Sequence, residues 1–170
     1  MTKTIHNETL PQPATVTSHA VRHTWFRLTL SSEIRIAASP KRIWEILTDF
    51  AAYESWNRAI PSAQGEATAG TMLQVLIQWP GLKRSNYELA ILAADPEREL
   101  RWLGHFGVTG LMDGDHRFII EADGTDGAKV TQTESFSGLL IPFFAPWLRD
   151  NVLSGFDQMN IALKMRAEMR

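Results

Sequence analysis

The sequence predicts an α+β domain in which a curved antiparallel sheet of about six or seven strands wraps around a long C-terminal helix. Three observations support this fold class. Apolar and polar residues alternate along several segments from Arg27 onward. Two short helices are expected between Ser39 and Pro61, directly after the first of these segments, and apolar residues recur at helical spacing from Pro146 to Arg170. A helix this long needs a broad apolar surface, which a curved antiparallel sheet provides.

The composition is that of one globular domain, and it excludes several functional classes. The chain has 170 residues, of which 44% are hydrophobic, and this is enough apolar material for a core. The formal net charge of −2 provides no basic field for phosphate backbones, so nucleic acid is not an expected partner. Because the chain contains no cysteine, disulfides, thiolate nucleophiles and cysteine-ligated metals are excluded.

Residues 1–25 are polar and are expected to form a loosely held extension before a single domain at residues 26–170. Pro11 and Pro13 interrupt any regular pattern there. The segment lacks the continuous apolar stretch of a secretory signal, and no apolar run in the chain approaches the roughly 20 residues that span a bilayer. We therefore expect a cytoplasmic protein without a transmembrane segment, and the oligomeric state stays open.

Local patterns predict the first strand and the two short helices. From 27 to 37 the apolar residues alternate with polar ones, which indicates a half-buried strand. Ser39 precedes Pro40, and this pair is typical of the N-cap and first position of a helix. Asp49 is expected to cap a second short helix, which carries an aromatic stripe as far as Trp56.

The rest of the chain predicts a meander followed by the long helix. Further strands are expected after Pro61, over residues 73–79, 84–94, 99–106, 115–122 and 129–136. The turns between them are short, so the expected topology is antiparallel. The apolar segment 138–146 is expected to be irregular because Pro142 and Pro146 interrupt it. The final helix is expected to run from Pro146 to Arg170.

The segment around the two short helices resembles a known superfamily. The residues that carry the resemblance are Ser39-Pro40, Ile43-Trp44, Asp49-Phe50 and Tyr53-Glu54-Ser55-Trp56-Asn57. This pattern is similar to that of the START-like superfamily, also called SRPBCC or helix-grip, and within it to the polyketide cyclase/dehydrase and lipid-transport group. The proline that often stands beside Trp-Asn in the group is found here at Pro61. The resemblance covers residues 27–170.

The resemblance implies the helix-grip fold, with a deep and mostly apolar cavity between the sheet and the C-terminal helix. Residues with inward parity are the candidates for its wall: Ile77, Trp79, Trp102, His116, Phe118, Gln132, Glu134, Phe136, Phe156 and Met159. For each aromatic residue, simple core packing is the alternative. No cofactor is expected. No metal is expected either, because Asp113 and Asp115 beside His116 lack further ligands.

His116 and Glu134 are the polar exceptions on these inward faces. They lie on sequential expected strands and could pair, and an imidazole beside a carboxylate can act as an acid/base couple. The alternative is a buried structural pair, or a bulge that turns one of them to solvent. Gln132 is a third inward polar candidate, which would orient a ligand oxygen.

Apolar residues in two loops are candidates for a lid over the cavity mouth: Phe106, Leu139, Ile141 and Phe143. The segment 138–146 could instead form an edge that touches a membrane transiently, or pack as a plain connection under the helix. The glycine-containing loop 104–114 could act as a hinge opposite it.

Three functions remain open from the sequence. The first is a binding module that holds a small hydrophobic or amphipathic molecule, such as a lipid, a polyketide or an aromatic compound. The second is an enzyme of the polyketide cyclase/aromatase kind, in which His116 and Glu134 move protons. The third is a protein-interaction domain that regulates a larger enzyme, for which a collapsed cavity and a large exposed apolar patch are expected.

Overall fold

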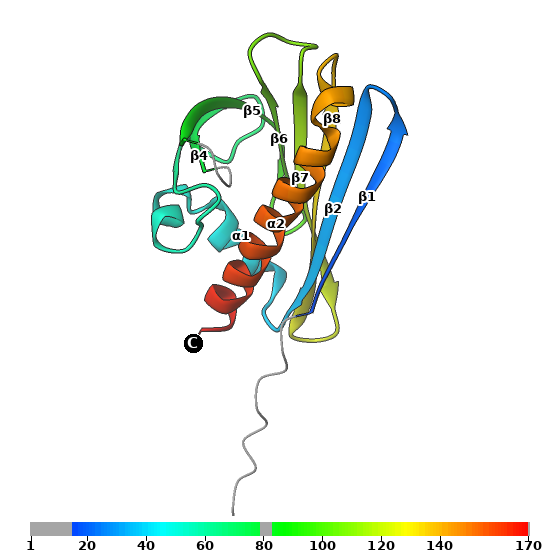
Figure 1. Ribbon diagram of the computed structural model, residues 1–170. Coiled ribbons are helices and arrows are strands. Elements are labelled where there is room, and N and C mark those ends of the chain that lie inside the picture. The colour runs from blue at the N-terminus through cyan, green and yellow to red at the C-terminus, as the bar shows by residue number, and fades with distance from the viewer. Residues whose placement is uncertain (1–14, 79–82, 170) are drawn as a thin grey trace, which may run out of the picture.

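The computed structural model describes residues 15–78 and 83–169 of the chain. In this part, an eight-stranded antiparallel sheet curves around the C-terminal helix α2 (Ile141–Glu168), as Figure 1 shows. The strands are β1 (Val16–Thr24), β2 (Arg27–Ile36), β3 (Ser62–Gln64), β4 (Met72–Ile77), β5 (Ser85–Asp95), β6 (Glu99–His105), β7 (Asp113–Asp123) and β8 (Gly127–Ser137). Between β2 and β3 lie the helix α1 (Pro40–Thr48) and the 3-10 helix η1 (Phe50–Ser55).

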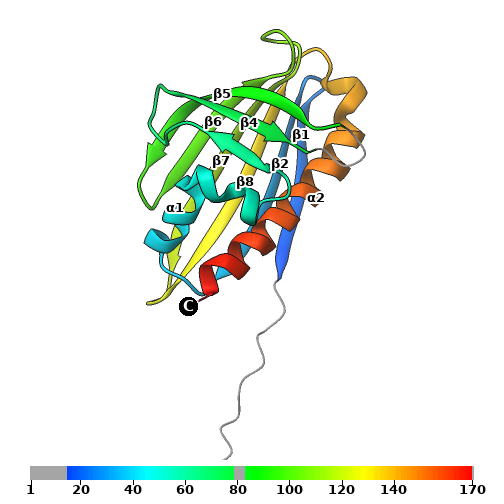
Figure 2. The same ribbon diagram turned by 90° about the vertical axis from the view of Figure 1, so that its left-hand side faces the viewer.

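The sheet has the strand order β1-β2-β8-β7-β6-β5-β4-β3, so strands that are far apart in the sequence, β2 and β8, lie side by side. Figure 2 shows that the sheet curves and that α1 and α2 lie on its concave side. The α+β fold class with a curved sheet and a long C-terminal helix is therefore confirmed. No helix in the described part of the chain is long and apolar enough to cross a membrane.

The number of strands differs from the expected six or seven, because β1 and β3 add to the predicted set. Residues 16–24, expected to belong to a loose extension, pair with β2 from Val16 opposite Ile34 to Val21 opposite Thr29. Most β1 side chains are exposed, so backbone hydrogen bonds rather than an apolar face hold this edge strand. A strand of this kind leaves no alternating hydrophobic pattern in the sequence.

The long helix begins at Ile141, before the predicted start at Pro146. Pro142 lies in the first turn, where a backbone N–H has no partner within the helix, so its missing donor costs nothing. Pro146 lies inside the helix. Because Pro146 has no N–H, the carbonyl of Pro142, four residues earlier, loses its hydrogen-bond donor within the helix. The expectation that the two prolines keep residues 138–146 irregular was therefore wrong for 141–146.

The caps of the two short helices follow the sequence only in part. Ser39 accepts a hydrogen bond from the Arg42 backbone N–H (3.2 Å), which confirms it as the N-cap of α1. Asp49 occupies the N-cap position of η1 but makes no side-chain capping hydrogen bond, so its predicted capping role was wrong. The second short helix ends at Ser55 and is a 3-10 helix.

Two buried polar side chains hold the corner after these helices. The Tyr53 hydroxyl donates to the Leu47 carbonyl (2.7 Å), and burial, with a smaller contribution from Asp49, raises the pKa of Tyr53 well above its ordinary value. The side chain of Asn57 is 1% exposed, and its Oδ1 accepts hydrogen bonds from the backbone N–H groups of Ala59 (3.1 Å) and Ile60 (3.0 Å). Tyr53 and Asn57 of the sequence motif therefore stabilise the corner after the two short helices.

Replacing Asn57 by alanine is expected to destabilise the protein by about 2–3 kcal/mol, because two backbone N–H groups near a buried corner lose their acceptor. Urea unfolding monitored by circular dichroism measures this change. Glu54→Ala is the matched control, since Glu54 is exposed in the same segment, and it should stay within about 0.5 kcal/mol of wild type. Equal stability of the two variants would contradict the structural role of Asn57.

The buried side chains form two separate hydrophobic clusters. The first joins α1, η1 and the C-terminal half of α2 to the sheet and includes Ile43, Leu73 and Leu163. The second joins the N-terminal half of α2 to β2 and β8 and includes Leu30 and Leu148. Because the apolar interior is split in this way, the space between the two clusters is where a cavity is expected.

Candidate ligand cavity

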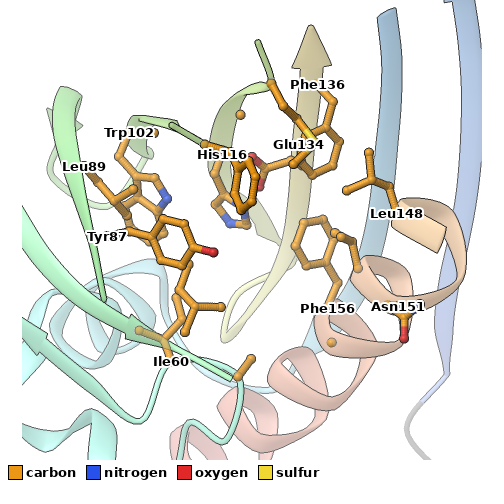
Figure 3. A pocket seen from close by; sticks show the side chains of 18 of the residues that line it. Ile60, Tyr87, Leu89, Trp102, His116, Glu134, Phe136, Leu148, Asn151 and Phe156 are labelled. Atoms are coloured by element: carbon orange, nitrogen blue, oxygen red, sulfur yellow. The ribbon is translucent and has the colours of Figure 1, made fainter. Parts of the chain in front are cut away.

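A cavity of about 330 Å³ lies between the curved sheet and α2. Its wall includes members of both hydrophobic clusters, with Leu89 and Trp102 from the first and Phe136 and Phe156 from the second. Figure 3 shows Tyr87, Leu89 and Trp102 on one side of this space and Phe136, Leu148 and Phe156 on the other, with His116 and Glu134 between them. The exposed wall residues His105, Phe106 and Phe144 bring the cavity to the surface.

Most of the side chains expected on the wall are found there: Ile77, Trp102, His116, Gln132, Glu134, Phe136, Phe156 and Met159. Phe118 is completely buried and does not line the cavity; its ring packs at an angle against Trp102 (5.4 Å between centroids) and His116 (4.6 Å). Phe118 therefore supports the wall from behind. Trp79 lies outside the described residues.

His116 and Glu134 form a pair, as the register of the expected strands allowed. They are direct cross-strand neighbours on β7 and β8, and His116 Nδ1 lies 2.7 Å from Glu134 Oε2. The Trp102 ring stacks on the imidazole, with 5.0 Å between centroids and 10° between planes, and Phe156 meets it edge-on. These rings and the carboxylate fix the orientation of the imidazole.

The hydrogen bond to Glu134 determines which imidazole nitrogen carries a proton. A carboxylate only accepts hydrogen bonds, so His116 Nδ1 carries the proton that is shared with Glu134. The other nitrogen, Nε2, is buried and has no hydrogen-bond partner among residues 15–78 and 83–169. An unpartnered buried nitrogen costs free energy, which a ligand can recover by bonding to it.

Glu134 occupies space that a glycine leaves open. A Cβ atom at Gly114 would stand 2.4 Å from Glu134 Oε1 and 3.5 Å from the Phe136 ring. Any larger residue at position 114 would therefore force the Glu134 carboxylate to shift from its present position. The absence of a side chain at Gly114 makes room for the pair.

Gln132 is held by a chain of hydrogen bonds that runs behind α2. Its Nε2 lies 2.6 Å from Asn160 Oδ1, and Asn160 Nδ2 donates to Ser32 Oγ (3.0 Å). Ser32 Oγ donates to Asp157 Oδ1 (2.7 Å), which also accepts from Ser18 on β1. Gln132 and Asn160 are completely buried, and within the described part of the chain Gln132 Oε1 has no hydrogen-bond partner.

Residues 27–168 match the protein-family model described as polyketide cyclase / dehydrase and lipid transport. The chain belongs to this family. The resemblance seen in the sequence is thereby confirmed. A comparison of this sequence with curated proteins gives no significant match.

Solved structures share the fold of this family member. A START superfamily protein from Mycobacterium smegmatis is 20% identical, with 82% of this chain and 97% of that chain covered and a TM-score of 0.67. The di-domain ARO/CYC protein BexL from the BE-7585A biosynthetic pathway is 14% identical, with 87% and 52% covered and a TM-score of 0.70. Truncated norcoclaurine synthase from Thalictrum flavum is 14% identical, with 95% and 100% covered and a TM-score of 0.63. At these identities the likeness establishes the helix-grip fold alone.

The four lid candidates of this polyketide cyclase/dehydrase family member lie in different environments. Phe106 lines the cavity and is half exposed, as expected of a mouth residue. Ile141 is completely buried in the second hydrophobic cluster, because α2 already begins there, so it does not cover the mouth. Leu139 and Phe143 are exposed and do not line the cavity, whereas the neighbouring Phe144 does.

Several wall residues of this family member were not among the sequence candidates. Tyr87 and Leu89 share the period-two pattern of β5, and Leu148 and Val152 share the helical stripe of α2, so these four carried a usable signal. Other wall residues carried none, because they are polar or small or lie in a loop: Ala59, Ile60, Gln78, Gly104, Gly114, Asn151 and Gly155. Only the fold brings these to the cavity.

Proposed function

We propose that this protein binds a small hydrophobic or amphipathic molecule, such as a lipid, a polyketide or an aromatic compound, in the cavity between the sheet and α2. The observation that carries the proposal is a space of about 330 Å³, walled mainly by aromatic and aliphatic side chains, between the two hydrophobic clusters. This volume lies at the lower end of the roughly 300–1,000 Å³ of ligand pockets. An apolar molecule buried there would supply van der Waals contacts that the two clusters do not make with each other.

Native mass spectrometry tests the proposal. The protein is incubated with an extract of lipids and aromatic metabolites, desalted, and measured under native and denaturing conditions. We expect an added mass in the native spectrum that is lost on denaturation. An unliganded native mass after exposure to the whole extract would contradict the proposal.

A second function, proton transfer, is favoured by the His116–Glu134 pair. The imidazole is oriented by a carboxylate at 2.7 Å and by a stacked Trp102 ring, and its other nitrogen has no hydrogen-bond partner among the residues that the structure describes. In the neutral form this nitrogen can take a proton from an acidic C–H or O–H of a bound molecule, while Glu134 stabilises the imidazolium that results. This is the chemistry that a polyketide cyclase/aromatase needs when it forms an enolate or aromatises a ring.

Proton exchange at a model ketone measures this activity. We expect the protein to accelerate α-deuterium uptake by 2-tetralone in D₂O, followed by NMR, and His116→Ala to lower the acceleration at least about tenfold. Glu134→Gln removes the carboxylate and should lower it as well, while binding of the ketone persists. Exchange no faster with wild-type protein than with His116→Ala would argue for a carrier without this chemistry.

The protein-interaction alternative is less favoured by these observations, since it was tied to a collapsed cavity. Figure 1 shows the β1–β2 turn, the β6–β7 loop and the start of α2 at the same end of the molecule. Exposed apolar residues occur in or next to these segments: Trp25, Phe26, Val108, Leu139 and Phe143. The transient membrane contact inferred from the sequence would use this end, and it stays a prediction.

A further inference from the structure

Two buried polar atoms beside the cavity have no hydrogen-bond partner within the described structure: His116 Nε2 and Gln132 Oε1. Both side chains line the cavity, and both residues are at least nine-tenths buried. Buried polar atoms in folded proteins are nearly always paired, so two unpaired ones at the same wall call for an explanation. A ligand that accepts or donates hydrogen bonds at both atoms would explain why the protein leaves them unpaired.

The two residues that carry these atoms lie close to each other in the sheet. Residue 116 is directly opposite residue 134 on β7 and β8, and residue 118 is opposite residue 132. His116 and Gln132 are therefore diagonal neighbours on the same face, at roughly 7–8 Å. Both belong to the same part of the cavity wall.

Hydrogen-bond polarity makes His116 Nε2 an acceptor. Glu134 holds the proton of the imidazole at Nδ1, because a carboxylate cannot donate. In the neutral imidazole the second nitrogen then carries a lone pair and no hydrogen. A hydroxyl group can donate to this nitrogen, whereas an ether or a ketone oxygen cannot.

The polarity at Gln132 is set mainly by a chain of hydrogen bonds that ends at Asp157. A longer contact of Gln132 Nε2 with the Phe156 carbonyl (3.5 Å) favours the same orientation. The Asp157 carboxylate only accepts, so the Ser32 hydroxyl must donate to it, and Ser32 Oγ is left to accept from Asn160 Nδ2. Asn160 Oδ1 therefore faces Gln132 and accepts a hydrogen bond from the Gln132 Nε2 donor. The remaining atom of the Gln132 amide, Oε1, is an acceptor whose orientation cannot be reversed without breaking the chain.

We propose that the cavity selects apolar molecules that carry hydrogen-bond-donating hydroxyl groups, such as phenols and enols, over their ethers and ketones. The inference rests on the proposed binding function and adds the ligand's chemical class. His116 Nε2 and Gln132 Oε1 accept from the hydroxyl groups, and the apolar body packs between Trp102 and Phe156. The Tyr87 hydroxyl on the facing wall points toward the same space (Figure 3) and bonds a further oxygen of either polarity.

Isothermal titration calorimetry with a matched pair of compounds tests the inference. The probes are 2-naphthol and 2-methoxynaphthalene, which share a ring system and differ in the donor. We expect 2-naphthol to bind about tenfold more tightly, which is the effect of one good hydrogen bond to a buried acceptor.

Two variants trace the preference to the proposed atoms. Gln132→Met removes the acceptor at similar shape, and Asp157→Asn allows the remote chain of hydrogen bonds to reverse its polarity without touching the ligand. In both we expect the preference for 2-naphthol to fall below about threefold. Binding of 2-methoxynaphthalene by Asp157→Asn should stay at the wild-type level, because Asp157 is not among the residues that line the cavity, and this shows that the cavity is intact.

The outcomes separate this inference from the function on which it rests. Equal affinity of wild-type protein for both probes, or tighter binding of the ether, would overturn the donor preference and leave hydrophobic binding standing. Binding of neither probe would count against both. A preference that survives unchanged in Gln132→Met and Asp157→Asn would show that other groups create it.

Discussion

Gly155→Phe is expected to abolish most ligand binding while the fold stays intact. Gly155 lies on α2 in the cavity wall, and a Cβ atom added there would meet none of the described residues within 4 Å. A phenyl ring at this position enters the space that a ligand would occupy. Displacing roughly 100 Å² of apolar ligand contact at about 25 cal/mol per Å² costs about 2.5 kcal/mol, which corresponds to about a sixtyfold loss of affinity for 2-naphthol.

Gly155→Ala is the matched control for this experiment. A methyl group at position 155 fits into open space, and alanine favours a helix over glycine by about 0.5–1 kcal/mol. We therefore expect a slightly more stable protein that binds 2-naphthol within about threefold of wild type. If Gly155→Phe also bound like wild type in calorimetry, the ligand would lie elsewhere, and the proposed cavity function would be wrong.

Gly138→Ala is expected to lower the free energy of unfolding by about 3 kcal/mol or more. Gly138 joins β8 to α2 with a φ of 136°, a conformation that side chains rarely adopt. A Cβ atom there would stand 2.5 Å from the Leu111 carbonyl oxygen and 2.8 Å from that of Gly110, and these are backbone atoms of the β6–β7 loop. Backbone strain and steric overlap therefore act together.

The same substitution is expected to loosen the mouth of the cavity. Leu139 and Leu140 donate backbone hydrogen bonds to the carbonyls of Gly110 and Leu111 (3.1 and 3.0 Å), so the β6–β7 loop and the start of α2 are tied together beside Gly138. Hydrogen exchange should show faster exchange of the Leu139 and Leu140 amides in the variant. Thermal unfolding should shift down by roughly 6–12 °C.

Gly124→Ala separates strain from overlap. Gly124, in the β7–β8 turn, also has a positive φ of 76°, but a Cβ atom there would have no neighbour within 4 Å in the part of the chain that the structure describes. This variant should lose only about 1–2 kcal/mol, which is the cost of the left-handed conformation alone. If urea unfolding found both variants equally destabilised, contact between Gly138 and the β6–β7 loop would not be the cause.

The sequence predicted the inner faces of the strands because each face depends on one element at a time. Period-two alternation along β7 and β8 put His116 and Glu134 on the same side as Phe118 and Phe136, and the register then made His116 and Glu134 direct neighbours. The Ser39-Pro40 helix start was found for the same reason, since a cap involves residues three positions apart. These local rules were sufficient to identify the pair proposed for proton transfer.

Features that depend on contacts between distant segments were missed. The strand β1 has no apolar face to reveal it and forms because β2 offers an edge. The early start of α2 was missed because Pro142 and Pro146 usually indicate the end of a helix. Here both prolines lie near the start of the helix, where they are tolerated. Phe118 has the right parity for the wall, yet Trp102 and His116 cover it, and parity alone carries no information about which inward residue is covered.

Local sequence patterns were enough to predict the fold class, the family motif around Tyr53 and Asn57, and the polar pair on an apolar face. Periodicity and capping encode these features within a single element. Three features became visible only in the folded chain: a cavity remains between two hydrophobic clusters, Gly155 adds no side chain to its wall, and Asp157 orients Gln132 through two intermediate side chains. Packing volume and hydrogen-bond polarity depend on groups that meet only when β2, β8 and α2 come together in space.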